Sequence, residues 1–193
     1  MPLGDSITYG YGDPTFAGYR GPLGSLLAAR AATVNFVGSQ LAGPGSIDRD
    51  NEGHAGLRTD ELATSVSTWL AAEPAALVLL LAGTNDIVQG YTSTENRIGS
   101  LIDAIASASP TSKILVSTLP PFTDAGFQTE RHRVNTALAP VVPAHGGILV
   151  DAGDLVIATD LVASPDPNAG HPNTTGYGKM ADDWNAAMQA NGY

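Results

Sequence analysis

Residues 76–86 read Ala-Leu-Val-Leu-Leu-Leu-Ala-Gly-Thr-Asn-Asp, an apolar run that gives way abruptly to a glycine and polar residues. Continuous apolar character over so short a stretch is typical of a parallel strand that is buried on both faces of a sheet. Similar short runs, rich in leucine or β-branched residues, predict further strands at residues 33–37, 113–117 and 147–150. The stretch therefore predicts a parallel sheet with polar groups where its strands end.

Helical periodicity alternates with these strands. Apolar residues at spacings of three and four predict five helices, marked by residues 23–27, 62–70, 98–105, 134–141 and 180–188. Thr59 is predicted to cap the second of these helices, because a threonine oxygen accepts hydrogen bonds from the first free backbone N–H groups. With a first strand at the start of the chain, the pattern predicts a three-layer α/β/α sandwich around a five-stranded parallel sheet.

The bulk composition predicts one globular domain. The chain has 193 residues, of which 43% are hydrophobic and 15% charged, which suits a single sizeable core and leaves no room for a second comparable domain. We expect one domain over residues 1–193. Its first strand is expected to be truncated, since only Met1 to Leu3 precede the first turn and a buried strand usually has about five or six residues.

The charge and the cysteine content exclude several classes of partner and site. The formal net charge is −10, which argues against nucleic acid and anionic lipid because nothing would neutralise their phosphates. The chain has no cysteine, so disulfides, thiolate zinc sites and a cysteine nucleophile are excluded. The longest apolar stretch, near residues 75–82, is far shorter than the ~20 residues of a membrane helix, and no membrane span is predicted.

Residues 4–6, Gly-Asp-Ser, place a serine where the first strand is expected to end. An exposed serine at such a turn can attack an acyl carbon if a histidine reaches it, although the tripeptide alone also suits an ordinary turn. Three other polar blocks follow strand ends or lie in loops that can reach the same edge, at residues 51–56, 83–86 and 168–173. Because ligands bind beyond the carboxyl ends of strands in open parallel sheets, the four blocks predict one site.

Taken in order, Ser6, Gly56, Asn85 and His171 in these blocks resemble the four motifs of the SGNH hydrolases, also called GDSL esterases. The resemblance spans nearly the whole chain. Residues 1–8, 18–20 and 52–56 resemble the branch that contains the acetyl xylan esterases of carbohydrate esterase family 3.

This resemblance implies a flavodoxin-like fold and a carboxylic ester hydrolase that uses no cofactor and no metal. It implies a small-molecule or polysaccharide substrate bearing short acyl esters, foremost O-acetyl groups on a carbohydrate such as xylan. It also implies an extracellular enzyme, although no signal peptide is visible in the chain and a cytoplasmic location stays open. The same scaffold also serves lysophospholipases and thioesterases, so a lipid acyl-hydrolase is an alternative.

Each of the four residues has a role by this resemblance. Ser6 is the nucleophile, and His171 is the base that takes its proton and later gives it to the leaving alcohol. The backbone N–H groups of Ser6 and Gly56 and the side-chain amide of Asn85 form the oxyanion hole. Residues 4–8 lack the closing glycine of the Gly-x-Ser-x-Gly elbow, so an ordinary α/β-hydrolase is not predicted.

The third member of the triad departs from the family pattern. The family places an aspartate three residues before the histidine, where this chain has Asn168. An asparagine oxygen can orient the His171 ring but cannot stabilise its cation with a full charge. Asp166 is an equal candidate, Asp160 a more remote one, and a backbone carbonyl a fourth possibility. The departure also motivates a second alternative, an inactive carbohydrate-binding protein on the same fold.

The remaining polar candidates have structural interpretations. His132 is expected on a solvated helical face and His145 at a helix end, while His54 either shapes the oxyanion loop, contacts substrate or is an ordinary loop residue. Asp86 is interpreted as bracing its loop. No metal motif is present. An acidic cluster could hold a hard cation but is interpreted as a solvated, turn-rich loop; it comprises Asp48, Asp50, Asn51 and Glu52.

Overall fold

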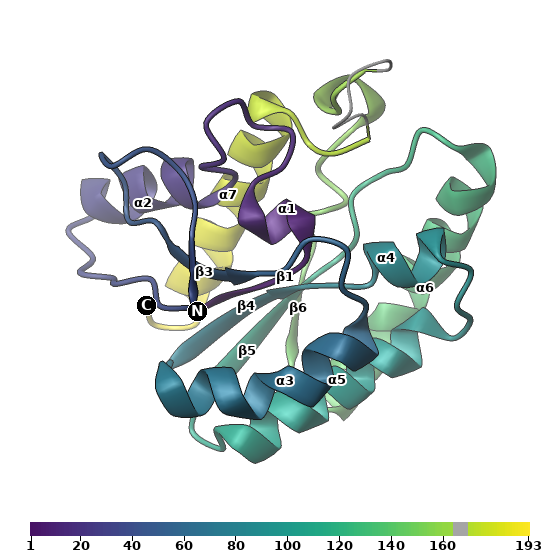
Figure 1. Ribbon diagram of the computed structural model, residues 1–193, viewed down its shortest axis with the longest axis horizontal. Helices are drawn as coiled ribbons and strands as arrows, with labels where there is room; N and C mark the ends of the chain where they lie inside the picture. The colour runs from purple at the N-terminus through teal and green to yellow at the C-terminus, as the bar shows by residue number, and fades with distance from the viewer. Residues whose placement is uncertain (164–169) are drawn as a thin grey trace.

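A computed structural model of the chain describes residues 1–163 and 170–193. A central sheet crosses the molecule, and its strands follow the order β2-β3-β1-β4-β5-β6 (Figure 1). All pairings are parallel except that of β2 with β3. The strands are β1 (Pro2–Gly4), β2 (Gln40–Leu41), β3 (Asp50–Gly53), β4 (Leu77–Leu81), β5 (Lys113–Ser117) and β6 (Ile148–Val150).

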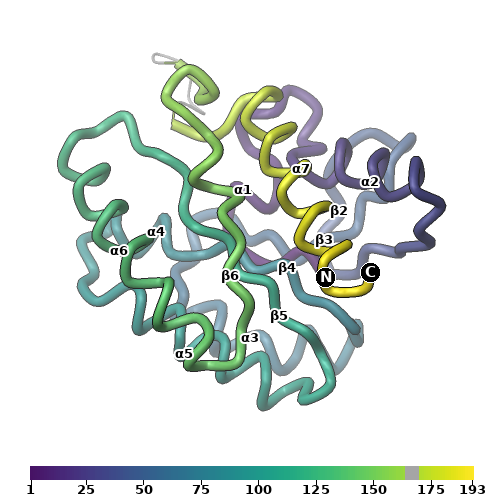
Figure 2. The backbone as a smooth tube through the Cα atoms, turned by 180° about the vertical axis from the view of Figure 1, so that it is seen from behind, coloured from purple at the N-terminus to yellow at the C-terminus, as the bar shows by residue number. Residues whose placement is uncertain are grey.

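Helices cover both faces of the sheet. In the two opposite views α2 and α7 lie on one face, and α3, α5 and α6 lie on the other (Figures 1 and 2). The predicted three-layer sandwich is therefore confirmed. The helices are α1 (Ser6–Tyr9), α2 (Arg20–Ala29), α3 (Thr59–Ala72), α4 (Thr84–Val88), α5 (Thr94–Ala108), α6 (Ala125–Ala144) and α7 (Thr174–Ala190), with a short 3₁₀ helix, η1 (Ala158–Asp160).

Strand β4 explains why the run at residues 76–81 contains no polar residue. Leu79 and Leu81 pack in the core beneath α2 and α7, whereas Val78 and Leu80 pack in the core beneath α3, α5 and α6. Alternate side chains thus enter two different cores. Burying each of them contributes about 1.5–3 kcal/mol, so the strand is apolar on both faces.

The prediction of a strand at residues 33–37 is wrong. Those residues form no strand, and Val34 is 39% exposed. The parallel partner of β1 on that side is β3, at residues 50–53, where a loop was expected. With the short antiparallel β2, the described part of the chain forms a sheet of six strands instead of five.

The polar sequence of β3 concealed this strand. Asn51 and Glu52 are both fully buried, so the interpretation of the acidic cluster as a solvated loop is wrong for these two residues. The side-chain amide oxygen of Asn51 accepts the backbone N–H of Gly53 at 2.9 Å, and the Glu52 carboxylate accepts the backbone N–H of Ser39 at 2.7 Å. Because these groups are satisfied internally, burying them is tolerated.

The predicted cap of α3 is also wrong by one residue. Arg58 precedes the helix, and Thr59 is its first residue. The hydroxyl of Thr59 donates to the Asp86 carboxylate at 2.7 Å, so a contact distant in sequence replaces the local cap. No helix among the described residues is both long enough and apolar enough to cross a membrane.

Candidate active site

Ser6 lies at the carboxyl end of β1, where the chain turns directly into α1. Asp5 caps this helix by accepting the backbone N–H of Ile7 at 2.9 Å. Glycine is required at position 4, because an added Cβ would lie 2.0 Å from the carbonyl oxygen of Leu81. The close packing of β1 against β4 therefore fixes the turn, and the turn presents the half-buried serine at the sheet edge.

His171 reaches Ser6 from the segment before α7. Its Nε2 lies 2.9 Å from the Ser6 Oγ, a hydrogen-bond distance that suits a nucleophile and its base. The backbone carbonyl of His171 accepts the backbone N–H of Val162 at 2.9 Å, and the backbone N–H of Asn173 donates to the backbone carbonyl of Asp160 at 2.8 Å. The backbone on both sides of the histidine is therefore anchored to residues 160–162.

Gly56 and Asn85 line the same cleft as Ser6 and His171, a space of about 510 Å³. Gly56 has a φ of +85°, a left-handed conformation that favours glycine. The Asn85 amide donates one hydrogen bond to the carbonyl of Leu57 at 3.0 Å. Because an amide nitrogen carries two hydrogens, Asn85 keeps a second donor. The structure thus gathers the four residues of the sequence motifs around one cleft.

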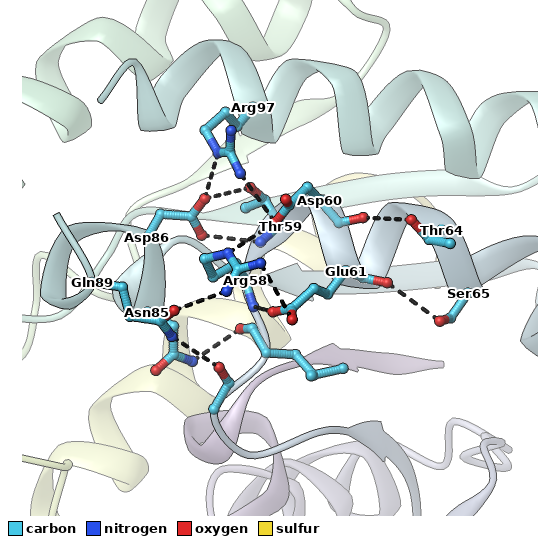
Figure 3. A network of polar contacts seen from close by, with 12 residues as sticks. Arg58, Thr59, Asp60, Glu61, Thr64, Ser65, Asn85, Asp86, Gln89 and Arg97 are labelled. Atoms are coloured by element: carbon cyan, nitrogen blue, oxygen red, sulfur yellow. Dashed lines mark hydrogen bonds and ion pairs between the residues drawn. The ribbon is translucent and has the colours of Figure 1, made fainter. Parts of the chain in front are cut away.

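A buried carboxylate joins the two loops that carry Gly56 and Asn85. Asp86 is fully buried and accepts the backbone N–H of Thr59 at 3.0 Å and the Thr59 hydroxyl at 2.7 Å. Figure 3 shows Arg97 reaching from α5 to the same carboxylate, which its Nε contacts at 2.7 Å. Asp86 therefore holds the start of α3 against α4, as the interpretation of a bracing residue predicts.

A second chain of contacts runs from Arg58 through Gln89 to the Gly56 backbone, and Figure 3 shows Arg58 and Gln89 in it. Arg58 donates to the side-chain oxygen of Gln89 at 2.8 Å, and the Gln89 amide donates to the carbonyl of Gly56 at 3.2 Å. The Gly56 carbonyl is thereby held by the side chain of Gln89, the residue that follows α4. This contact ties the Gly56 backbone to the helix that carries Asn85.

Asp5, the residue before Ser6, has an unusually high pKa. Burial raises the pKa of Asp5 to about 7, an effect that the hydrogen bond from the Ile7 backbone partly offsets and the nearby Asp86 charge increases. The carboxyl next to the serine therefore titrates near neutral pH. Sequence reasoning did not anticipate this, because Asp5 reads there as part of a turn motif.

Arg20 holds the loop that follows α1, and sequence reasoning missed it. Its side chain is 1% exposed, and its guanidinium donates to five backbone carbonyls, those of Thr8, Tyr9, Phe16, Ala42 and Arg49. No carboxylate in the described part of the chain accepts a hydrogen bond from it. The only signal was the Gly-Tyr-Arg sequence at residues 18–20, which carried the family resemblance without a role.

Apolar side chains form another wall of the cleft that was not predicted. Phe122 and Phe127 lie with their ring centroids 5.7 Å apart, and both line the cleft together with Ile7 and Val88. Ile7 belongs to α1, Val88 ends α4, Phe122 precedes α6 and Phe127 lies in the first turn of α6. Sequence reasoning had no basis for grouping them, because each belongs to a different loop or helix end.

The other predicted residues lie outside this cleft. His132 is exposed on α6, and His145 follows the last turn of α6, as predicted. Asp160 is engaged by Lys179, whose Nζ lies 2.6 Å from its carboxylate. Asp166 and Asn168, the two leading candidates for orienting His171, lie outside the described residues.

Comparisons with known proteins identify the family of this chain. The model of the GDSL-like lipase/acylhydrolase family matches residues 3–179. The chain belongs to this family. The GDSL-like fold is shared closely with a family 3 carbohydrate esterase of Clostridium thermocellum, at a TM-score of 0.87 and 25% identity over 99% of this chain and 94% of that one.

A carbohydrate esterase family 3 structure from Talaromyces cellulolyticus is similar in fold, at a TM-score of 0.80 and 24% identity over 99% and 96% of the two chains. A multidomain esterase of Ruminococcus flavefaciens is 28% identical over 95% of this chain. The chain spans 27% of that relative's length. The predicted resemblance is confirmed, and the chain is placed among carboxylic ester hydrolases of the GDSL type.

Proposed function

We propose that this GDSL-type hydrolase is a serine esterase that removes short acyl groups, foremost acetyl, through an acyl-enzyme. The observation that carries the proposal is the Ser6 Oγ lying 2.9 Å from the His171 Nε2, in a cleft also lined by Gly56 and Asn85. A nucleophile, a base and hydrogen-bond donors around one space are the parts that acyl transfer needs.

The reaction follows from these positions. The Ser6 oxygen attacks the acyl carbon while His171 takes the serine proton at Nε2, and an oxyanion forms on the carbonyl oxygen. The second N–H of Asn85 and the backbone N–H groups of Gly56 and Ser6 stabilise that oxyanion. The ester C–O bond then breaks, and His171 gives its proton to the leaving alcohol. Water activated by His171 releases the acid and regenerates Ser6.

The remaining part of the proposal concerns the residue that orients the His171 ring through its Nδ1. We assign its orientation to Asp166 or Asn168, both outside the described residues. An aspartate would stabilise the histidine cation by charge, whereas an asparagine would only fix the tautomer. Asp166→Ala and Asn168→Ala, assayed separately for kcat, identify the residue by which substitution lowers kcat.

For the substrate we propose O-acetyl groups on a carbohydrate such as xylan, hydrolysed outside the cell. The support is the likeness to the Clostridium thermocellum carbohydrate esterase. The chain's own acidic balance, −10, suits an uncharged substrate better than a phosphate-bearing one.

The apolar wall of the cleft favours a second candidate, hydrolysis of longer acyl esters of the lysophospholipase or thioesterase type. Phe122, Phe127 and Val88 offer a surface on which an alkyl chain can pack. The two candidates differ in the acyl length that gives the highest kcat/KM.

A substrate panel tests both candidates. It consists of p-nitrophenyl esters from acetyl to dodecanoyl together with acetylated xylan, assayed with the wild type, Ser6→Ala and the exposed-serine control Ser100→Ala. We expect kcat/KM to be highest for acetyl, acetate to be released from xylan, and Ser6→Ala alone to be inactive. A rate that rises with chain length would favour the lipid acyl-hydrolase, and no turnover at all the inactive binding protein.

A further inference from the structure

A second cleft adjoins the one that contains Ser6. Its volume is about 340 Å³, and it shares Tyr11 and Ala55 with the first cleft. Its other lining residues come from three segments, the end of α1, strand β2 and the end of β3, and they are Tyr9, Gln40, Gly53, His54 and Leu57. A substrate that passes from one cleft to the other therefore crosses Tyr11 and Ala55.

Three aromatic rings gather beside this second cleft. The centroids of Tyr9 and Tyr11 are 5.6 Å apart, and Phe16 lies 6.0 Å from Tyr9 and 5.5 Å from Tyr11. Tyr11 also lies 5.8 Å from the ring of His171. The rings thus form a continuous aromatic surface that leads away from the candidate base.

This aromatic surface is maintained against backbone strain. Phe16 has a φ of +58°, a left-handed conformation that costs a non-glycine residue about 1–3 kcal/mol, and its side chain is 39% exposed. The Arg20 guanidinium holds the carbonyls of Phe16 and Tyr9 at 2.8 and 3.0 Å. A strained, half-exposed phenylalanine fixed by a buried arginine is a feature that stability alone does not favour.

The polar groups of the second cleft are available to a ligand. Across residues 1–163 and 170–193, the phenol hydroxyls of Tyr9 and Tyr11 have no hydrogen-bond partner, and the side chain of Gln40 bonds only through Nε2, to the Ser39 hydroxyl at 3.2 Å. Each phenol can donate or accept, and the Gln40 oxygen can accept. The cleft therefore combines aromatic faces with free donors and acceptors.

His54 adds a polar ring in a fixed position to this cleft. Its Nε2 lies 2.5 Å from the carboxylate of the fully buried Glu52, and its ring stacks on Trp69 at 4.3 Å with an angle of 9° between the planes. Burial raises the pKa of Glu52, but hydrogen bonds from His54 and Ser39 outweigh that effect and leave it below its usual value. The contact with Glu52 engages Nε2, which leaves Nδ1 as the second polar atom of a ring that Glu52 and Trp69 hold in place.

We infer that the second cleft binds a sugar ring on the alcohol side of the scissile ester. A pyranose has apolar C–H faces, which suit aromatic rings, and a rim of hydroxyls, which suits the free groups of Tyr9, Tyr11, Gln40 and His54. This inference rests on the proposed esterase function. It assigns leaving-group recognition to side chains that are not part of the proposed oxyanion hole.

The kinetic test compares two acetyl esters with different alcohols, acetylated xylotetraose and ethyl acetate. Tyr9→Ala and Gln40→Ala change residues that line only the second cleft. We expect each to lower kcat/KM for the oligosaccharide about tenfold more than for ethyl acetate, as loss of one good contact of about 1.4 kcal/mol requires. Ile157→Ala, which removes a 54% exposed side chain outside both clefts, is the control and leaves the ratio unchanged.

Equal losses on both esters overturn the inference. Adding phenyl acetate separates the sugar from an aromatic alcohol, because a loss greater for phenyl acetate than for the oligosaccharide also overturns it. The proposed function is judged separately by the wild type. Hydrolysis of ethyl acetate without a change in the ratio contradicts only the second cleft, whereas no hydrolysis of any ester contradicts the esterase itself.

A binding measurement avoids turnover altogether. Ser6→Ala protein is titrated with unacetylated xylotetraose while the backbone amide signals of residues 9–11, 40 and 53–55 are followed by NMR. We expect saturable shifts at these amides, and their loss in Ser6→Ala/Tyr9→Ala. The absence of saturable shifts, or shifts confined to α5 and α6, would place no sugar in this cleft.

Discussion

The wall of the first cleft that carries Gly56 and Asn85 (the oxyanion wall of the proposed function) and the aromatic surface beside the second cleft (the aromatic wall) are each held by an arginine. The two arginines have different partners. On the oxyanion wall, Arg97 is 27% exposed and pairs with the fully buried Asp86. On the aromatic wall, Arg20 is 1% exposed and donates to five backbone carbonyls. One wall is organised around a carboxylate that accepts hydrogen bonds, and the other around a cation that donates them.

The difference shows how each wall serves its task. At the oxyanion wall, Asp86 accepts hydrogen bonds from Thr59 at the start of α3 and from Arg97 of α5. We expect these contacts to keep the proposed donors of Gly56 and Asn85 at a fixed separation. At the aromatic wall, the planar fork of Arg20 collects carbonyls from three segments and sets the path of an irregular loop. We therefore expect substitutions at the oxyanion wall to lower kcat and substitutions at the aromatic wall to lower the free energy of unfolding.

The largest effect is expected from Arg20→Met. Five backbone carbonyls, three of them in part-buried contacts, lose the hydrogen bond from the guanidinium. Each carbonyl left unsatisfied costs about 1–3 kcal/mol unless water replaces the arginine. We expect the free energy of unfolding, measured in urea, to fall by at least about 3 kcal/mol. Arg20→Lys should rescue little, because an ammonium has only three donors. Arg49→Met, at an exposed arginine of the same region, is the control, and an equal loss there would remove the special role of Arg20.

Asn85→Ala is expected to lower kcat rather than the free energy of unfolding. Removing one oxyanion donor costs about 10²–10³ in kcat, while the half-buried position limits the change in unfolding free energy. Steady-state kinetics and urea unfolding on the same preparation separate the two effects. Asn96→Ala removes an exposed asparagine of α5 and should change neither; near-normal kcat in Asn85→Ala would exclude Asn85 from the oxyanion hole.

The pH dependence of stability sharpens the comparison at Asp5. Its pKa rises from 3.8 to about 7 on folding, so the folded state holds a proton that the unfolded state releases between these values. Stability is therefore greatest below pH 4 for this group and falls by about 1.4 kcal/mol for each pH unit up to about 7. Asp5→Asn keeps the acceptor for Ile7 and should flatten that slope, as urea unfolding between pH 5 and 8 would reveal. An unchanged slope would show that Asp5 does not cause it.

Asp86→Asn should give the smallest of these effects, a loss of kcat. The amide keeps one acceptor for Thr59 but places N–H groups against donors, so the two oxyanion loops separate slightly. We expect kcat to fall about tenfold, or 1.4 kcal/mol, with little change in KM. Asp60→Asn is the matched control, because Asp60 contacts the same Arg97 but is 49% exposed. A rise in KM at constant kcat would contradict the positioning role.

The sequence predicts the parts of this molecule whose physics is local. Strand β4 is recognisable because both of its faces enter apolar cores, which leaves no polar residue in the run. The motifs of Ser6, Gly56, Asn85 and His171 follow strand ends or lie in loops at the same edge, so placing them around one cleft needs only the rule for parallel sheets.

The parts that could not be predicted depend on contacts between distant residues. Strand β3 reads as a loop because Asn51 and Glu52 are polar, and only their buried partners make a strand possible. The sequence around Thr59 predicts a helix cap, because its actual partner, Asp86, lies 27 positions away and no local pattern indicates that contact. The partners of Arg20 are carbonyls, which every residue has, so no pattern of side chains could reveal them.

The central claim is that Ser6, activated by His171, becomes covalently acylated. The most direct measurement is labelling with a serine-reactive phosphonate, followed by intact mass and peptide mapping of the wild type, Ser6→Ala and His171→Ala. We predict one adduct on the wild type, located on Ser6, no adduct on Ser6→Ala, and much slower labelling of His171→Ala. An unlabelled wild type, or an adduct on another serine, would contradict the claim.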